Sequence, residues 1–462
     1  MVVQHNMQAA NANRMLNVTT GQQAKSTEKL SSGYRINRAA DDAAGLTISE
    51  KMRKQIKGLD RASTNAQDGV SAVQTAEGAL TEVHSMLQRM NELAVQASNG
   101  TNSDVDRGAI QDEISQLTTE IDRVAETTKF NETYLLKGSN TTKDVYMKGH
   151  DAGLKGTLTD SATSATFKVA AGALDAGKSV TIGGKDYTIG STLDETKALA
   201  NAAKTKKSTS FDVDGTKYNV DAQGKITKDG DATATEVTVD DIVKAGSKVT
   251  YDGKTLTAMN DADNNGIDDA DSSVITAAKA VGLMTNELTA ANNIGATKTA
   301  ATVTAGTYAS DTGVEFTIDK GTAEVAEKLS FSLHVGSDAD MTNKITVDIE
   351  TMNSSYLGIK GLDVNDDSGI AATYAIDAIS DALQKVSEQR SSLGAVQNRL
   401  EHTIDNLDNV VENTTTAESR IRDTDMASEM VNYSKNNILA QAGQSMLAQA
   451  NQSTQGVLSL LQ

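Results

Sequence analysis

The residue types that most often carry enzyme chemistry are scarce in this chain. Its 462 residues include no cysteine, which removes thiol nucleophiles, disulfides and thiolate metal ligands. No histidine lies in HExxH, GxSxG or P-loop spacing. The five histidines are His5, His84, His150, His334 and His402. We therefore assign no catalytic residue and no cofactor, and we expect a protein that is not an enzyme.

One acidic segment, residues 261–269, resembles the start of a calcium-binding loop. Oxygen-bearing side chains occupy alternate positions, and Gly266 is the sixth residue. However, the twelfth position holds Ser272 instead of a bidentate glutamate, and Ile267 comes one position early. We favour a solvated acidic turn and assign no metal ligand, while binding of calcium stays open as the alternative.

Two clusters of mixed charge flank the helical parts of the chain. The first consists of Arg35, Arg38, Asp41 and Asp42, and the second of Arg420, Arg422, Asp423 and Asp425. In one interpretation they are solvated junctions, since exposed ion pairs contribute only about 0–1 kcal/mol. In the other they bridge neighbouring copies of the chain and contribute to polymerisation.

Both chain ends are almost free of charge. Residues 432–462 contain ten Asn or Gln and one charged side chain, Lys435, and the first 24 residues contain only Arg14 besides His5. A helix on the surface of an isolated protein normally has a charged outer face. A stripe at helical spacing near the C-terminus consists of Leu439, Ala442, Met446, Ala450, Val457 and Leu460. We expect these ends to be buried in an intermolecular bundle, and a monomeric core is the alternative.

Three long helices are expected from heptad spacing. Steps of four and three from Ile48 to Ala97 meet apolar residues at every position except Gln55 and Gly69. A second seam runs from Ile110 to Val124, and a third from 372 to 411. A repeat of 3.5 residues predicts coiled-coil packing, and such seams bury one another only if the two flanks of the chain meet in space.

Turn and cap residues separate the first two of these helices. Gly100 is a candidate C-terminal cap for the first, and Asn102 or Ser103 is a candidate N-cap for the second, followed by the acidic Asp104 and Asp106.

The middle of the chain, residues 139–370, has a different composition. It is rich in Thr, Gly, Asp and Ala, and it contains lysine but no arginine. Hairpins are expected around Gly183-Gly184, Asp214-Gly215 and Asp252-Gly253. Further strands are expected at 314–318, 329–335 and 345–349, with a short helix near 193–204. The fold class is therefore α+β and multidomain, with a helical bundle formed by both termini and a β-rich inserted outer region.

Charge and hydropathy exclude several partners. The formal net charge of −19 argues against nucleic acid, because phosphate binding needs a basic surface. No apolar run approaches the roughly 18 residues of a membrane span. We expect no membrane insertion and no cleaved signal peptide at the N-terminus.

Several ordered motifs in both flanks resemble bacterial flagellin. They are the segments 30–37 (LSSGYRIN), 41–45 (DDAAG), 87–96 (LQRMNELAVQ), 419–423 (SRIRD) and 446–451 (MLAQAN). The resemblance covers about the first 138 and last 90 residues. It implies a subunit that polymerises with itself into the extracellular flagellar filament after leaving the cell unfolded through the flagellar type III apparatus. Its implied partners are an export chaperone and the cap and hook-associated proteins.

The resemblance also implies contacts with host immune receptors. The flagellin-sensing Toll-like receptor would bind at Gln88, Arg89, Leu93 and Glu113. Inflammasome sensors would read the stretch containing Val457, Leu458, Leu460 and Leu461, which we also expect to take part in polymerisation.

The expected domains follow from these boundaries. They are residues 1–45 and 419–462 for the inner core, 46–138 and 371–418 for the helical layer, and 139–370 for the exposed outer region. A hook–filament junction protein is the closest alternative, and an outer region with glycan-binding or adhesive activity is another.

Overall fold

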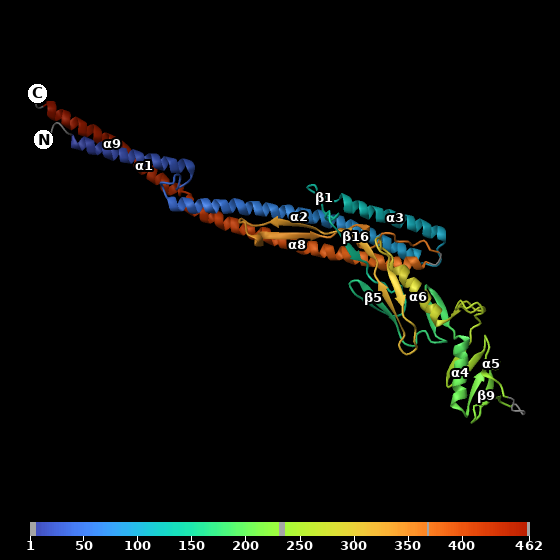
Figure 1. Ribbon diagram of the computed structural model, residues 1–462. Helices are drawn as coiled ribbons and strands as arrows, with labels where there is room; N and C mark the ends of the chain where they lie inside the picture. The colour runs from blue at the N-terminus through green and yellow to red at the C-terminus, as the bar shows by residue number, and fades with distance from the viewer. Residues whose placement is uncertain (1–5, 231–235, 367–368, 460–462) are drawn as a thin grey trace. The chain divides into compact units, whose positions relative to one another are not determined.

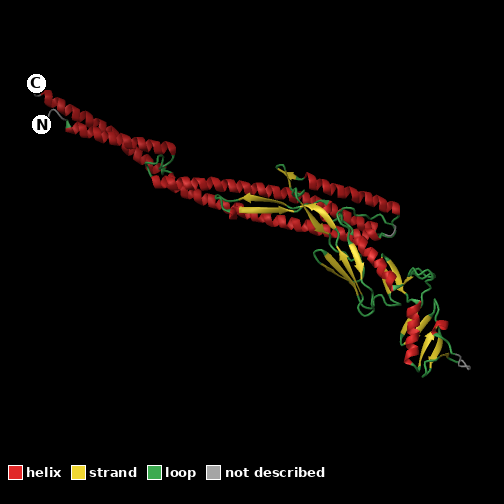
Figure 2. Ribbon diagram, viewed as in Figure 1, coloured by secondary structure: helices red, strands yellow, loops and turns green. Residues whose placement is uncertain are grey.

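The computed structural model describes residues 6–230, 236–366 and 369–459, and side chains of the last helix as far as Ser453. The chain divides into two compact units. The first consists of residues 1–71, 332–347 and 396–462, and the second of residues 72–331 and 348–395. Figure 1 labels the helices and strands, and Figure 2 distinguishes the helical segments from the β-rich ones.

The described residues form nine α-helices and one short 3-10 helix. They are α1 (Met7–Ser32), α2 (Ala43–Ala97), α3 (Asp104–Thr127), α4 (Leu193–Lys206), α5 (Val239–Ile242), α6 (Ala277–Asn292), η1 (Met341–Asn343), α7 (Ser354–Leu357), α8 (Ile370–Arg422) and α9 (Met426–Ser459).

The strands lie between α3 and α8. They are β1 (Lys129–Phe130), β2 (Thr133–Tyr134), β3 (Thr142–Tyr146), β4 (Thr157–Asp160), β5 (Ser164–Val169), β6 (Ser179–Ile182), β7 (Lys185–Ile189), β8 (Thr209–Val213), β9 (Thr216–Val220), β10 (Ile226–Lys228), β11 (Lys248–Tyr251), β12 (Lys254–Thr257), β13 (Val274–Ile275), β14 (Thr302–Ala305), β15 (Val314–Asp319), β16 (Thr322–Ala326), β17 (Leu329–His334) and β18 (Lys344–Ile349). This distribution confirms the predicted α+β class.

The helices α2 and α8 bury the heptad seams that the sequence predicted. In the first unit, Leu59 and Ala62 pack with Leu407, and Ala66 packs with Leu400. The early and late flanks of the chain therefore meet in space, and Figure 1 shows α2 running beside α8. The seam begins later than expected, because Ile48 at the start of α2 is about half exposed, at 47%.

The glycine that interrupts the first seam has a structural reason. A Cβ atom at Gly69 would lie 2.2 Å from Cδ1 of Leu333, a residue of β17 that packs against α2. The absence of a side chain at position 69 therefore makes room for the β17–β18 hairpin.

The cap predicted for the end of α2 was wrong in one detail. The helix ends at Ala97, and Gly100 does not adopt the left-handed conformation of a glycine cap. Instead, the buried Arg107 of α3 donates from Nε to the carbonyl oxygen of Ala97 at 3.1 Å. The predicted N-cap of α3 is confirmed, since Ser103 and Asp106 form a capping box.

The three predicted hairpins are confirmed in the second unit. The strand pairs β6–β7, β8–β9 and β11–β12 are antiparallel. Both central residues of each turn have positive φ, as in Asp214 (53°) and Gly215 (80°). This is the geometry in which a two-residue turn matches the right-handed twist of its strands.

Two β-rich cores stand out among the described residues of the second unit. In the larger one, Phe167 and Phe316 of the β14–β15–β5–β4 sheet pack with Met284 and Leu288 of α6. In the other, α4 covers the sheet β10–β9–β8–β11–β12 through Ala200 and Ala203. The helix predicted near 193–204 is therefore present as α4, whereas α6 and the parallel pair β13–β7 were not predicted.

Candidate assembly surface: the paired terminal helices and their junction

The helices α1 and α9 pack against each other in the first unit (Figure 1). The pair is antiparallel, since Nδ2 of Asn6, at the start of α1, donates to the carbonyl oxygen of Ala450, far along α9, at 3.2 Å. The residues that face the partner helix are at least half-buried and recur in steps of three and four: Ala9, Ala12, Leu16, Thr19, Gln23, Ser26 and Leu30 on α1, and Tyr433, Asn436, Ala440, Gly443, Leu447 and Ala450 on α9.

This seam consists mainly of small or polar residues, so it buries little apolar surface. Only Ser26 of α1 and Asn436 and Ala440 of α9 are fully buried among the described side chains of the pair. Gly443 faces Leu16, and a Cβ there would make only an ordinary van der Waals contact at 3.4 Å. Apolar packing within one chain therefore contributes little to the stability of this pair.

Large apolar side chains remain exposed around the seam. The predicted stripe residues Leu439 and Met446 lie one position before Ala440 and Leu447, and they are 46% and 61% exposed. Of that stripe, Ala450 lies in the seam within the chain. Sequence reasoning missed several further exposed residues, which are Met7, Met15 and Val18 on α1 and Met430, Val431 and Ile438 on α9. The sequence could have indicated them, because they are large apolar residues in segments that have almost no charge.

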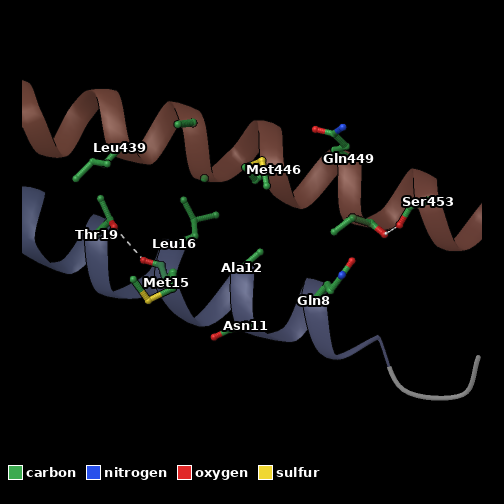
Figure 3. Close-up of a pocket in the computed structure, with 13 residues that line it drawn as sticks. Gln8, Asn11, Ala12, Met15, Leu16, Thr19, Leu439, Met446, Gln449 and Ser453 are labelled. Atoms are coloured by element: carbon green, nitrogen blue, oxygen red, sulfur yellow. Dashed lines mark hydrogen bonds between the residues drawn. The ribbon is translucent and has the colours of Figure 1, made fainter. Parts of the chain in front are cut away.

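A groove of about 740 Å³ follows this flank of the helix pair. Figure 3 shows Leu439 and Met446 projecting from α9 toward Ala12, Met15 and Leu16 of α1. Amide side chains lie at its rim, including Gln8, Asn11 and Gln449, and none of its lining residues is charged. Such a surface is suited to an apolar or amide-rich helix.

The remaining C-terminal residues of the predicted polymerisation set are not described at side-chain level. Val457 and Leu458 belong to α9, whose side chains are described only to Ser453, and Leu460 and Leu461 lie outside the described residues. Their role stays a prediction.

The two mixed-charge clusters meet within one chain. The linker after α1 and the linker before α9 form an antiparallel bridge between Tyr34 and Asp423. The amide of Arg35 donates to the carbonyl oxygen of Arg422 at 2.7 Å, and the side chain of Arg35 donates to the carbonyl oxygen of Ile421. The structure therefore brings the clusters together mainly through their backbones.

The acidic residues of the clusters accept hydrogen bonds from backbone amides close to them in the sequence. Asp42 accepts from the amide of Gly45 at 2.8 Å at the start of α2, and Asp425 accepts from the amide of Ala427 at 3.0 Å at the start of α9. Asp41 accepts from the amide of Arg38 at 2.9 Å, and this hydrogen bond holds the pKa of Asp41 below its ordinary value. These carboxylates order the linkers within the chain.

The arginines pair with carboxylates outside the opposite cluster, which the sequence did not predict. Arg422 pairs with Glu50 of α2 at 2.5 Å, and Arg38 pairs with Glu28 of α1 at 2.9 Å. Arg35, Arg38 and Arg420 are exposed and accessible to a neighbouring chain, whereas the Arg422 side chain is largely buried. A bridge between copies through these clusters stays a prediction.

The expected receptor surface lies on α2 and α3 of the second unit. Arg89 of α2 donates from Nε to Oε1 of Glu113 of α3 at 2.9 Å, so these two residues are neighbours. Gln88 lies beside Arg89 and contacts His84 at 3.2 Å. Leu93 is only 2% exposed, so it belongs to the helical core and contributes to any such surface by holding α2 in place.

The acidic segment 261–269 forms a hydrogen-bonded turn. The Asp261 carboxylate accepts from the amides of Asn265 at 3.0 Å and Gly266 at 2.9 Å. Within residues 6–230, 236–366 and 369–459, no group of three or more His, Asp or Glu side chains is arranged to hold a metal ion. Calcium binding there stays the untested alternative.

His150 lies in a partly buried charged cluster of the second unit. Its Nε2 is 3.7 Å from Oδ2 of Asp381 on α8, and Lys148 donates to Oδ1 of the same carboxylate at 2.7 Å. Both backbone groups of His150 are bound by the side chain of Asn292. Burial lowers the pKa of His150, although the attraction of Asp381 and Asp377 opposes this shift.

No helix in the described part of the chain is both long enough and apolar enough to cross a membrane.

Comparison with known proteins places the chain in a family. The bacterial flagellin N-terminal helical region matches residues 3–141, and the bacterial flagellin C-terminal helical region matches residues 376–461. Flagellin of Clostridium tyrobutyricum is 42% identical over 98% of this chain and 100% of its own length. Flagellin of Bacillus subtilis (strain 168) is 35% identical over 100% of both chains. The chain therefore belongs to the bacterial flagellin family, as a structural subunit of the extracellular flagellar filament.

Proposed function

We propose that this chain polymerises by burying the exposed apolar flank of α1 and α9 against the terminal helices of other copies. The observation that carries this proposal is the uncharged groove beside Leu439 and Met446, in a helix pair whose own seam buries little. Apolar packing within one chain stabilises the pair only weakly, so packing against further copies would supply the remaining stability. Residues 1–45 and 419–462 would then form the inner core of the filament.

Seeded polymerisation of the purified full-length chain tests this proposal. We expect long fibres by electron microscopy, and none after deletion of residues 1–30 or 432–462. A chain that adds only a short segment to the seeds would favour a hook–filament junction protein. Long fibres formed by either deletion variant would refute the proposed surface.

The rest of the chain would surround this core. Residues 46–138 and 371–418 would form a helical layer, and residues 139–370 an outer region exposed on the filament. The Thr-rich outer region offers hydroxyl groups for glycan attachment or adhesive contacts. Intact-mass measurement on native filaments tests attachment, since a mass equal to that of the bare chain excludes it.

The chain is also proposed to leave the cell unfolded through the flagellar type III apparatus. The absence of proline and cysteine supports this route, because refolding then involves no X-Pro isomerisation and no disulfide formation. An export chaperone would hold the C-terminal helix, and the cap and hook-associated proteins would contact the growing polymer. Secretion assays in strains lacking the type III apparatus test the route, and continued export there would refute it.

The chain is further proposed to activate the flagellin-sensing Toll-like receptor. The contact between Arg89 and Glu113 supports a composite surface on α2 and α3, with Gln88 beside it. A receptor reporter assay with monomers tests this: Arg89→Ala should reduce the signal, and the control Arg123→Ala, whose exposed side chain pairs with Glu120 further along α3, should not. Recognition of the C-terminal stretch by inflammasome sensors is a separate proposal that substitution of Val457 and Leu458 would test.

A further inference from the structure

An aromatic side chain lies at the centre of the junction between the terminal helices and the long helices. Tyr34 belongs to the linker that follows α1, and its ring is 5.2 Å from Cζ of Arg53 and 5.1 Å from Cζ of Arg422. Nη2 of Arg53 also donates to the Tyr34 hydroxyl at 3.1 Å. One arginine comes from α2 and the other from α8, so the ring joins both long helices to the linker.

Each of these arginines is neutralised by a carboxylate of the opposite long helix. Arg53 of α2 pairs with Glu418 of α8 at 3.0 Å, and Arg422 of α8 pairs with Glu50 of α2 at 2.5 Å. The hydrogen bond from Arg422 holds the pKa of Glu50 below its ordinary value. The two pairs cross between the helices, and the ring contacts both of their cations.

The surroundings make the ring important to these cations. The Arg422 side chain is largely buried, and its Nε has no hydrogen-bond partner among the described residues. The face of an aromatic ring attracts a guanidinium group, and this attraction increases as water is excluded. Without the ring, two neighbouring guanidinium groups would remain in a partly desolvated site, and less attraction would offset the loss of water around them.

The backbone of the same residue fixes the path of the linkers. Tyr34 forms the antiparallel bridge with Asp423, and the amide of Thr424 donates to the carbonyl oxygen of Gly33 at 3.0 Å. Ile36, two residues further on, is buried. The directions in which α1 and α9 leave the junction are therefore tied to a single short segment.

We propose that Tyr34 is a positioning residue for polymerisation: by contacting Arg53 and Arg422 of its own chain, it fixes the two linkers and so presents the α1–α9 pair correctly to other copies. This inference rests on the proposed polymerisation through that pair. It assigns the charged junction a role within the subunit, and it accounts for an aromatic residue in a linker dominated by charged and small side chains.

The first test compares Tyr34→Phe with Tyr34→Leu in seeded polymerisation of the full-length chain. Phenylalanine keeps the ring and loses one hydrogen bond, so we expect a critical concentration within about threefold of the wild-type value. Leucine removes both cation contacts and should raise it by about tenfold or more. Circular dichroism of the monomers checks that the long helices remain folded. Equal critical concentrations for Tyr34→Leu and the wild type would overturn the proposal.

The second test separates attraction to the cations from simple packing. Tyr34→Leu is repeated in an Arg53→Met/Arg422→Met background, in which both charges are absent. If the ring acts through the guanidinium groups, the substitution should then change the critical concentration by less than about threefold, because interacting residues are not additive. An undiminished effect in that background would refute the proposed contacts. Failure of the wild type itself to polymerise would instead refute the proposed function.

Discussion

The exposed flank of the terminal helix pair gives a quantitative prediction for polymerisation. We consider the double substitution Leu439→Gln/Met446→Gln on α9. Glutamine has nearly the same intrinsic helix propensity as leucine and methionine, so α9 itself should be little affected. Neither side chain is buried in the seam with α1. The substitution therefore removes apolar surface that only another copy of the chain would cover.

The magnitude follows from the area that is still available for burial. Full burial of a Leu or Met side chain contributes about 1.5–3 kcal/mol. Since Leu439 is 46% exposed and Met446 is 61% exposed, covering what remains contributes about 1.6–3.2 kcal/mol for the two together. The critical concentration should therefore rise by about 15- to 200-fold.

Seeded polymerisation followed by light scattering measures the critical concentration directly. Leu439→Met/Met446→Leu is the matched control, because it exchanges apolar side chains of similar volume and should stay within about threefold of the wild type. A double glutamine variant that polymerises at the wild-type critical concentration would contradict the reasoning. It would mean that this flank remains exposed to water in the filament.

Three further predictions concern the folding of the subunit. Burial lowers the pKa of His150 from its ordinary value of 6.5, so the unfolded chain binds the proton more readily than the folded chain. The free energy of unfolding should therefore fall as the pH drops below about 6.5, by at most about 1.4 kcal/mol per pH unit. Calorimetry of His150→Gln should find that this contribution to the slope is missing. Gly313→Ala should lower the melting temperature of the outer region, because φ is +76° and the new Cβ would lie 2.1 Å from the carbonyl oxygen of Val169. The control Gly177→Ala, at φ +85° with open space around it, should have a smaller effect, and equal melting temperatures would contradict the argument. Ser103→Ala removes the capping box of α3 and should cost about 1 kcal/mol in urea unfolding, whereas an unchanged midpoint would show that the cap contributes nothing.

Much of the local structure was predictable because it depends on residues close together in the sequence. The heptad spacing of α2 and α8, the capping box at Ser103 and the two-residue turn at Asp214-Gly215 each reflect a short-range preference of the backbone or of helix periodicity. The neutral chain ends were equally visible, and they pointed to the helices that we propose to pack against other copies.

Other features were decided only when distant segments met. The seam of α9 passes through Ala440 and Gly443, and it leaves Leu439 exposed. Arg422 pairs with Glu50, 372 positions away in the sequence, and not with the acidic residues that follow it directly. The reason for a glycine at position 69 is visible only in the tertiary structure, where Leu333 packs against it. Sequence alone determined the periodicity, turns and charge of each segment; tertiary structure determined their contacts, since these depend on complementary shape and charge contributed by both partners.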